Sequence, residues 1–159
     1  MFSKDQLEVV GYSDADWGAN FDRQSYSGSV FMLGNTAISW RSQKQKYVAV
    51  STMEAEYVSL SEASKDAVFL RNLLSDLVGF SGAVDIYCDN QSAIKTVNNP
   101  VFHNRTKHID IRYHYVRQLV KEKLVRVVYV QTGHMLADIC TKGLHGPRHE
   151  KLTRYLGVA

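Results

Sequence analysis

The 159-residue sequence predicts a single α/β domain, spanning residues 1–159, with a mixed β-sheet flanked by helices. Three observations support this class. After residue 50, helical patterns alternate with two strand-like segments, which is typical of parallel strands joined by right-handed crossovers. Before it, two short strand-like segments flank Gly34-Asn35, a dipeptide that favours a tight antiparallel hairpin. Hydrophobic residues make up 45% of the chain, which is enough for one good core.

The first half of the chain contains three predicted strands and one long helix. Leu7–Trp17 alternates between apolar and polar side chains, as a half-buried strand does. Ser29–Leu33 and Ala37–Trp40 are the two strands of the hairpin. Ser51–Val78 contains neither Gly nor Pro, and its apolar residues recur at helical spacing, so it predicts a helix.

The second half alternates again between strands and helices. Gly79 and Gly82 separate the long helix from the next strand, and the last strand is predicted from its β-branched residues. In chain order we expect a strand over Val84–Cys88, helices over Gln91–Val97 and Ile109–Lys123, and a strand over Leu124–Val130. Two final helices are expected over Met135–Lys142 and Arg148–Tyr155.

Four acidic residues occur where an exposed carboxylate would not be expected. Asp14 and Asp89 each end a strand-like run, Glu56 lies within the long helix, and Asp138 is followed by Ile and Cys. Isolated buried carboxylates are costly, so they are usually paired, hydrogen-bonded or bound to metal. In open sheets the functional crevice lies beyond the carboxyl ends of parallel strands. The four acids therefore predict one site for a hard cation.

The spacing within the long helix separates Glu56 from its neighbour Glu54. Glu56 begins an inward-facing stripe at alternating steps of four and three, which continues through Leu60, Ala63, Ala67, Leu70, Leu74 and Leu77. Glu54 belongs to a mostly polar stripe, so we expect it to be solvated. The alternative is that Glu56 only makes a buried hydrogen bond or caps the helix.

Composition limits the classes of function. The two cysteines, Cys88 and Cys140, lie in apolar surroundings and are expected to be reduced core thiols of an intracellular protein. No apolar run is long enough to span a membrane and no signal-peptide pattern is visible, so no membrane partner is expected.

Charge is unevenly distributed although the formal net charge is only +3. Residues 1–22 hold five acids and one Lys, whereas residues 103–126 hold seven Lys or Arg, three His and two acids. An acidic site with a basic segment elsewhere suits a polyanionic substrate that also needs a cation. The alternative for the basic segment is a solvated helical face.

An ordered set of motifs resembles the ribonuclease H domain of copia-type LTR retrotransposon polyproteins. The resemblance spans nearly all of Leu7–Val158 and includes the motifs GYSDADW, YSGSVFMLGNTAISWRSQKQ, VSTMEAEYVSLSEASKDAVFLRNLL, YCDNQSAI, NNPVFHNRTKHIDIRYHYVR and ADICTKGL. Each motif alone is a weak signal, but the ordered set is specific. The resemblance implies a ribonuclease H-like fold, with a five-stranded sheet of order 3-2-1-4-5, and cleavage of the RNA strand of RNA–DNA hybrids.

The resemblance also assigns the acidic residues. The implied catalytic and metal-binding set is Asp14, Glu56, Asp89 and Asp138, holding two Mg²⁺ ions about 4 Å apart, with Mn²⁺ able to substitute. Asp14 would bridge both ions, Glu56 and Asp89 would complete one position, and Asp138 the other. Products with 5′-phosphate and 3′-hydroxyl ends are expected. Asp16 shares a strand face with Asp14 and is the second choice for the first acid.

Recognition of the hybrid is expected to use its backbone, its shape and the RNA 2′-hydroxyls. The candidate contacts are Asn90, Gln91, Ser92, Arg105, Lys107, His108, Arg112 and Arg117, with Lys44 and Lys46 from the other end of the sheet. Ribonucleases H often carry a mobile histidine before the last acid, but His134 is only four residues from Asp138, which favours a helix-start histidine. The resemblance further implies a reverse-transcriptase domain of the same polyprotein as partner, and a cytoplasmic location that includes virus-like particles.

Two other classes of function stay open. One is another nuclease or strand-transfer enzyme of the same acidic-cluster fold, such as an integrase-like core, although the order Asp-Glu-Asp-Asp and the ADICTK ending argue against it. The other is a non-catalytic or domesticated nucleic-acid-binding or assembly module, although the presence of all four acids argues against decay.

Overall fold

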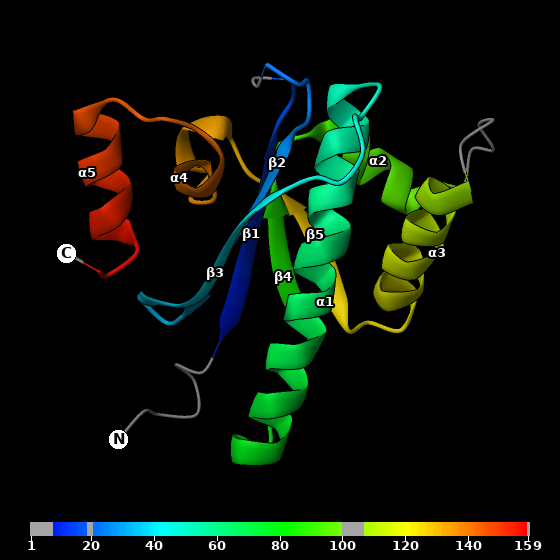
Figure 1. Cartoon of the computed structure of the whole chain (residues 1–159). Coiled ribbons are helices and arrows are strands. Elements are labelled where there is room, and N and C mark those ends of the chain that lie inside the picture. The colour runs from blue at the N-terminus through cyan, green and yellow to red at the C-terminus, as the bar shows by residue number, and fades with distance from the viewer. Residues whose placement is uncertain (1–7, 19–20, 100–106, 159) are drawn as a thin grey trace.

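Five strands form one mixed sheet with the order β3-β2-β1-β4-β5 (Figure 1). The computed structural model describes residues 8–18, 21–99 and 107–158, without the side chains of residues 107 and 108. Strand β1 pairs antiparallel with β2 and parallel with β4, and β5 is parallel to β4. The predicted sheet order 3-2-1-4-5 is confirmed.

The strands match the predicted positions, but the hairpin is longer than predicted. Their bounds are β1 Val9–Asp16, β2 Tyr26–Leu33, β3 Thr36–Lys44, β4 Val84–Cys88 and β5 Val125–Tyr129. Pairing of β2 with β3 continues as far as Tyr26 opposite Lys44. The last residues of β3 are polar and exposed, because β3 is an edge strand, so hydrophobic periodicity does not reveal them. Gly34 supplies the positive φ of 60° at the hairpin turn.

Helices cover both faces of the sheet. Helices α1 (Thr52–Val78), α2 (Gln91–Asn98) and α3 (Lys107–Lys121) lie on one face, and α4 (Asp138–Thr141) and α5 (Gly146–Tyr155) lie on the other (Figure 1). The predicted helix Met135–Lys142 is too long. A 3₁₀ turn precedes Met135, residues 135–137 pack against the sheet and α5 outside any regular helix, and α4 has only four residues.

Two cores follow from this arrangement. The larger core lies between the sheet and α1 to α3 and includes Phe31, Leu60 and Val116. The smaller core lies under α4 and α5 and includes Val30, Met135 and Leu152. No described helix combines the length and the apolar character needed to cross a membrane.

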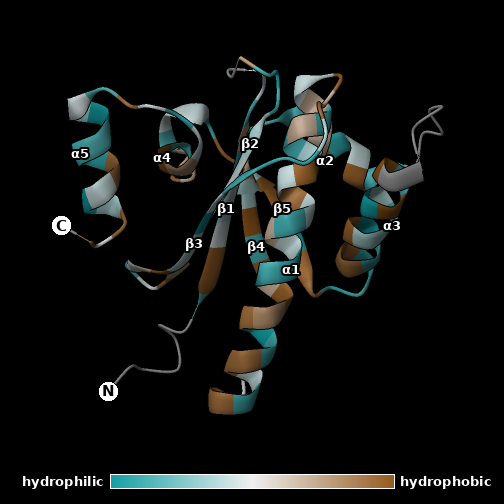
Figure 2. Cartoon of the chain, viewed as in Figure 1, coloured by the Kyte–Doolittle hydropathy of each residue, from teal (hydrophilic) through white to brown (hydrophobic). Residues whose placement is uncertain are grey.

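The buried face of α1 follows the predicted stripe except at its end. The stripe from Glu56 to Leu74 is buried at every predicted position, whereas Leu77 is 69% exposed. Phe69 and Val78 are also exposed there. Figure 2 shows hydrophobic residues gathered on the last turns of α1. The predicted burial of Leu77 is therefore wrong, because periodicity shows the phase of a helix but not where its packing partners end.

Candidate metal centre

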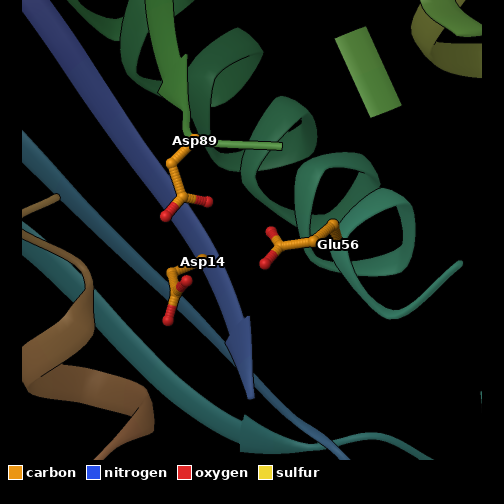
Figure 3. A group of neighbouring side chains, drawn as sticks. All are labelled: Asp14, Glu56 and Asp89. Atoms are coloured by element: carbon orange, nitrogen blue, oxygen red, sulfur yellow. The ribbon is translucent and has the colours of Figure 1, made fainter. Parts of the chain in front are cut away.

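Three carboxylates from separate parts of the chain meet at one end of the sheet. Asp14 lies in β1, Glu56 lies in α1, and Asp89 directly follows β4. Each residue offers one oxygen, and these atoms all lie within 4.8 Å of one another. Figure 3 shows the three side chains converging beside the end of β1.

The topology explains why Asp14 and Asp89 are neighbours. Strands β1 and β4 are adjacent and parallel, with Tyr12 paired to Tyr87. Asp14 and Asp89 each lie two positions beyond that pair, so both acids reach the same edge of the sheet. This end of the sheet, beyond the carboxyl ends of the parallel strands, is where open α/β sheets place their functional crevice.

The two glutamates near the start of α1 have different roles. The Ser51 hydroxyl accepts a hydrogen bond from the Glu54 backbone N–H (3.1 Å), and the Glu54 carboxylate accepts one from the Val50 N–H (3.2 Å). This reciprocal arrangement is close to a capping box, and it leaves Glu54 at the helix end. Glu56, two residues later, points inward and is only 4% exposed. Capping therefore belongs to Glu54 and not to Glu56.

Burial makes this cluster of acids electrostatically unfavourable when it is alone. Burial raises the pKa of Glu56 well above its ordinary value, and the nearby Asp14 and Asp89 carboxylates raise it further. Burial likewise raises the pKa of Asp14, despite the opposing effect of Lys142. The Glu56 Oε2 atom is buried and has no hydrogen-bond partner among the described residues. An acceptor in that position is costly unless something binds it.

The donor set fits a hard divalent cation. Carboxylate oxygens are the ligands that Mg²⁺ and Mn²⁺ prefer, and Mg²⁺ usually binds one or two carboxylates and keeps several waters. A cation here would satisfy the orphaned Glu56 Oε2 and remove the mutual repulsion of the triad. Asp14, Glu56 and Asp89, hereafter the acidic triad, are the residues that could hold it.

Asp138 lies beside the acidic triad, but its carboxylate forms ion pairs with Lys142 and Arg148. It is the first residue of α4 and is 2% exposed. Its Oδ1 atom lies 2.7 Å from the Lys142 Nζ, and its Oδ2 atom forms an ion pair with Arg148. Lys142 Nζ also lies 3.2 Å from Asp14 Oδ2, so one ammonium links Asp138 to the acidic triad.

Two threonines that the sequence analysis missed orient the carboxylates. The Thr141 hydroxyl donates a hydrogen bond to Asp14 Oδ2, and the Thr132 hydroxyl donates one of 2.8 Å to Asp89 Oδ2. Gly28, opposite Asp14 in β2, allows α4 to come this close, because a Cβ on Gly28 would lie 2.5 Å from Thr141 Cγ2. Nothing in the local sequence pattern indicates either threonine. The i, i+4 spacing of Asp138 and Lys142 is the one available signal for Lys142.

Asp16 and His134 take other positions. An Asp16 carboxylate oxygen accepts a hydrogen bond from the backbone N–H of Tyr26, which fastens the open end of the β1–β2 pair. His134 is exposed and ends the 3₁₀ turn Thr132–His134, and α4 begins only at Asp138, so the expectation that this histidine starts a helix is wrong.

Some of the candidate hybrid contacts on α2 and α3 are exposed, whereas others are used in hydrogen bonds within the fold. Gln91 and Ser92 are exposed in the first turn of α2, close to the acidic triad. Asn90 Oδ1 accepts a hydrogen bond from the Ala93 N–H (2.9 Å) and caps α2. Arg117 donates hydrogen bonds to the backbone carbonyls of Thr96 and Asn99, which joins α3 to the end of α2.

A basic hollow lies between β3, α1 and α3. Its volume is about 320 Å³, and it is lined by Ser27, Arg41, Gln43, Lys44, Gln45, Lys46, Val58, Glu62, Lys65 and Arg112. Arg112 forms an ion pair with Glu62, and Lys44 forms one with Asp22. Arg105 and the side chains of Lys107 and His108 lie outside what the structure describes.

Comparison with known proteins agrees with this architecture. The chain is 39% identical over 151 residues to the Retrovirus-related Pol polyprotein from transposon TNT 1-94 of Nicotiana tabacum, covering 94% of this chain and 11% of that protein. The LC11 ribonuclease H1 in complex with an RNA/DNA hybrid superimposes with a TM-score of 0.62 at 15% identity, covering 84% and 94% of the two chains. The foamy viral protease–reverse transcriptase in complex with an RNA/DNA hybrid superimposes with a TM-score of 0.64 at 19% identity, covering 89% of this chain and 20% of that chain. No family model matches.

The fold is thus that of ribonuclease H. In sequence, the chain is a homologue of one segment of copia-type retrotransposon Pol polyproteins, which confirms the resemblance seen in its motifs. It spans about a tenth of the length of the curated relative described above.

Proposed function

We propose that this chain is a metal-dependent ribonuclease H that hydrolyses the RNA strand of RNA–DNA hybrids during retrotransposon reverse transcription. The observation that carries the proposal is the acidic triad, with its oxygens within 4.8 Å of one another and the buried Glu56 Oε2 left without a partner. The triad lies at the sheet edge where this fold class binds its ligands.

The cofactor we propose is Mg²⁺, with Mn²⁺ able to substitute. Asp14, Glu56 and Asp89 would hold it, and Asp138 is the further acid at the same edge. When bound, divalent ions held by these residues would supply activation of the attacking water and stabilisation of the leaving 3′-oxygen. The chain's own residues orient the ligands, because Thr141 and Thr132 each fix one oxygen of a triad carboxylate. Such supporting hydrogen bonds typically change metal affinity or activity about 10- to 100-fold.

Hybrid binding is proposed to use polar residues beside the triad and basic residues of the hollow. Gln91 and Ser92 can exchange hydrogen bonds with 2′-hydroxyls beside Asp89, which is how a protein distinguishes RNA from DNA. The basic hollow supplies Lys44, Lys46 and Arg112 for phosphates, and phosphate contacts dominate affinity. Arg105, Lys107 and His108 remain proposed contacts of the same kind. In the intact polyprotein we propose a neighbouring reverse-transcriptase domain as partner and a cytoplasmic setting.

A cleavage assay distinguishes the competing functions. Wild-type protein and Glu56→Gln are incubated in Mg²⁺ with an RNA–DNA hybrid, double-stranded DNA and double-stranded RNA. We expect cleavage of the RNA strand of the hybrid alone, with 5′-phosphate and 3′-hydroxyl products, and its loss in Glu56→Gln. Cleavage of double-stranded DNA instead would indicate an integrase-like enzyme. Hybrid binding without cleavage would indicate the non-catalytic module.

A further inference from the structure

Lys142 occupies an unusual position between two buried carboxylates. Its Nζ atom lies 2.7 Å from Asp138 Oδ1, and 3.3 and 3.2 Å from the two Asp14 oxygens. Both aspartates are at most 2% exposed, whereas the Lys142 side chain is 38% exposed. The ammonium therefore reaches inward from the surface and pairs with both Asp14 of the triad and Asp138.

Arg148 completes this arrangement from α5. Its Nη2 atom forms an ion pair with Asp138 Oδ2 and donates a hydrogen bond of 2.9 Å to the Thr132 carbonyl. Both oxygens of Asp138 are therefore occupied by side-chain cations. The acidic triad differs, because Glu56 Oε2 has no partner among the described residues. The two halves of this acidic site are thus unequally open to a cation.

The ammonium of Lys142 is a permanent charge rather than a switch. Burial alone would lower the pKa of Lys142, but Asp14 and Asp138 outweigh burial and raise that pKa to about 12. Lysine carries a compact charge on a flexible stem, so it can leave the carboxylates without movement of the backbone. Ammonium groups cannot coordinate a metal ion, and one beside a cation position repels the incoming ion.

We propose that Lys142 is a built-in counter-cation that keeps the position between Asp14 and Asp138 closed to divalent metal until its side chain moves away. The chain then has two unequal cation positions, one open at the acidic triad and one guarded by Lys142. This inference rests on the proposed metal-dependent function, and it makes Lys142 a positioning residue that acts through Asp14 and Asp138.

Binding of Mn²⁺ alone tests the proposal without any nucleic acid. Titration calorimetry, together with the electron paramagnetic resonance signal of free Mn²⁺, gives the number of bound ions and their affinities. Wild type should bind one ion well and a second ion more weakly. Lys142→Gln, which keeps the stem and loses the charge, should tighten the second ion about tenfold or more. Lys142→Arg, which retains the charge, should resemble wild type, as should Lys151→Gln on α5, where the lysine lies over the Tyr155 ring.

The outcomes separate this inference from the proposed function. A second ion unaffected by Lys142→Gln, or two equally tight ions in wild type, overturns the inference while the proposed function stands. Absence of any Mn²⁺ binding that depends on Glu56 overturns the proposed function, and the inference with it. If Lys142→Gln is unfolded without metal, its refolding is followed by circular dichroism during the same titration. Refolding driven by Mn²⁺ supports the guarded position, and no refolding overturns it.

Discussion

Glu56 and Asp14 present carboxylate oxygens to each other within 4.8 Å, although each side chain is almost completely buried. Two like charges at that distance in a poorly solvated place repel each other strongly. Lys142 relieves Asp14, but the free Glu56 Oε2 has no such partner among the described residues. The fold therefore maintains an arrangement that is favourable only when a proton or a cation is present.

The first prediction is that divalent metal stabilises the fold. A ligand that binds only the native state stabilises it by about 2.7 kcal/mol at a concentration of 100 Kd. For a domain of this size we expect Mg²⁺ or Mn²⁺ to raise the melting temperature by about 5–10 °C. Differential scanning calorimetry with metal and with chelator measures the shift. A melting temperature that does not respond to millimolar metal would contradict the assignment of the acidic triad.

The second prediction concerns pH in the absence of metal. Burial, Asp14 and Asp89 raise the pKa of Glu56 well above the ordinary 4.5. At pH values between 4.5 and the raised pKa, the folded state therefore holds a proton that the unfolded state has lost. The free energy of unfolding contributed by Glu56 is therefore complete below about pH 4.5 and decreases as pH rises towards the raised pKa.

Urea unfolding of wild type and Glu56→Gln in chelator, over a series of pH values, isolates this contribution. As pH rises, the free energy of unfolding of wild type should fall relative to that of Glu56→Gln. A constant difference would mean that Glu56 titrates normally.

The third prediction separates the two glutamates of α1. Glu56→Gln removes a ligand charge with little change in volume, so hybrid cleavage should fall at least about 100-fold while the fold persists. Glu54→Gln can still accept the hydrogen bond from Val50 N–H, so its activity should stay within about twofold of wild type. Glu54→Ala should lower the free energy of unfolding by about 0.5–1 kcal/mol through loss of the cap. Rates at saturating hybrid and urea midpoints supply the two measurements. Equal loss of activity in both glutamine variants would show that the helical phase does not separate their roles.

The fourth prediction compares the two threonines that hold the triad. Thr141→Val is nearly isosteric and removes the donor to the buried Asp14, so metal affinity should fall about 10-fold or more. Thr132→Val removes the donor to Asp89, which is only half-buried and can take a water instead. Its effect should be smaller, about threefold. Calorimetric titration with Mn²⁺ ranks the variants, and a reversed ranking would mean that Thr141 serves packing and not the carboxylate.

Much of the fold is predictable because its information is local. Strand β4 has the predicted bounds, and the buried face of α1 is predicted from Glu56 to Leu74 by helical spacing alone. The failures have a shared cause. Residues 135–137 are buried by both α5 and the sheet, and Leu77 is exposed because the helix extends beyond its partners. Each depends on where distant elements stop, which no short window of sequence contains.

The candidate site divides in the same way. Asp14 lies near the end of β1, Asp89 directly follows β4 and Glu56 lies on the buried stripe of α1, so their convergence can be predicted from strand and helix phase. Thr132 and Thr141 act through long-range contacts to Asp89 and Asp14, and Arg148 reaches Asp138 from the next helix. Gly28 determines how closely α4 approaches, and nothing in its own sequence neighbourhood indicates that requirement. Supporting residues of this kind are visible only in three dimensions.

The last prediction concerns the basic hollow between β3, α1 and α3. Lys44 and Lys46 line it and both are exposed, so neutralising them should not disturb the core. If both contact phosphates, the double variant Lys44→Gln/Lys46→Gln should weaken hybrid binding and lower the slope of log affinity against log salt by about 2. Cleavage at saturating hybrid should fall far less than in Glu56→Gln, because phosphate contacts position the substrate and perform no chemistry. Arg71→Gln is a matched control, since Arg71 is half-buried on the far part of α1, where it donates hydrogen bonds to the Ser81 and Gly82 carbonyls and does not line the hollow. Affinities measured at several salt concentrations decide the matter, and an unchanged slope in the double variant would reassign the hollow to a solvated surface.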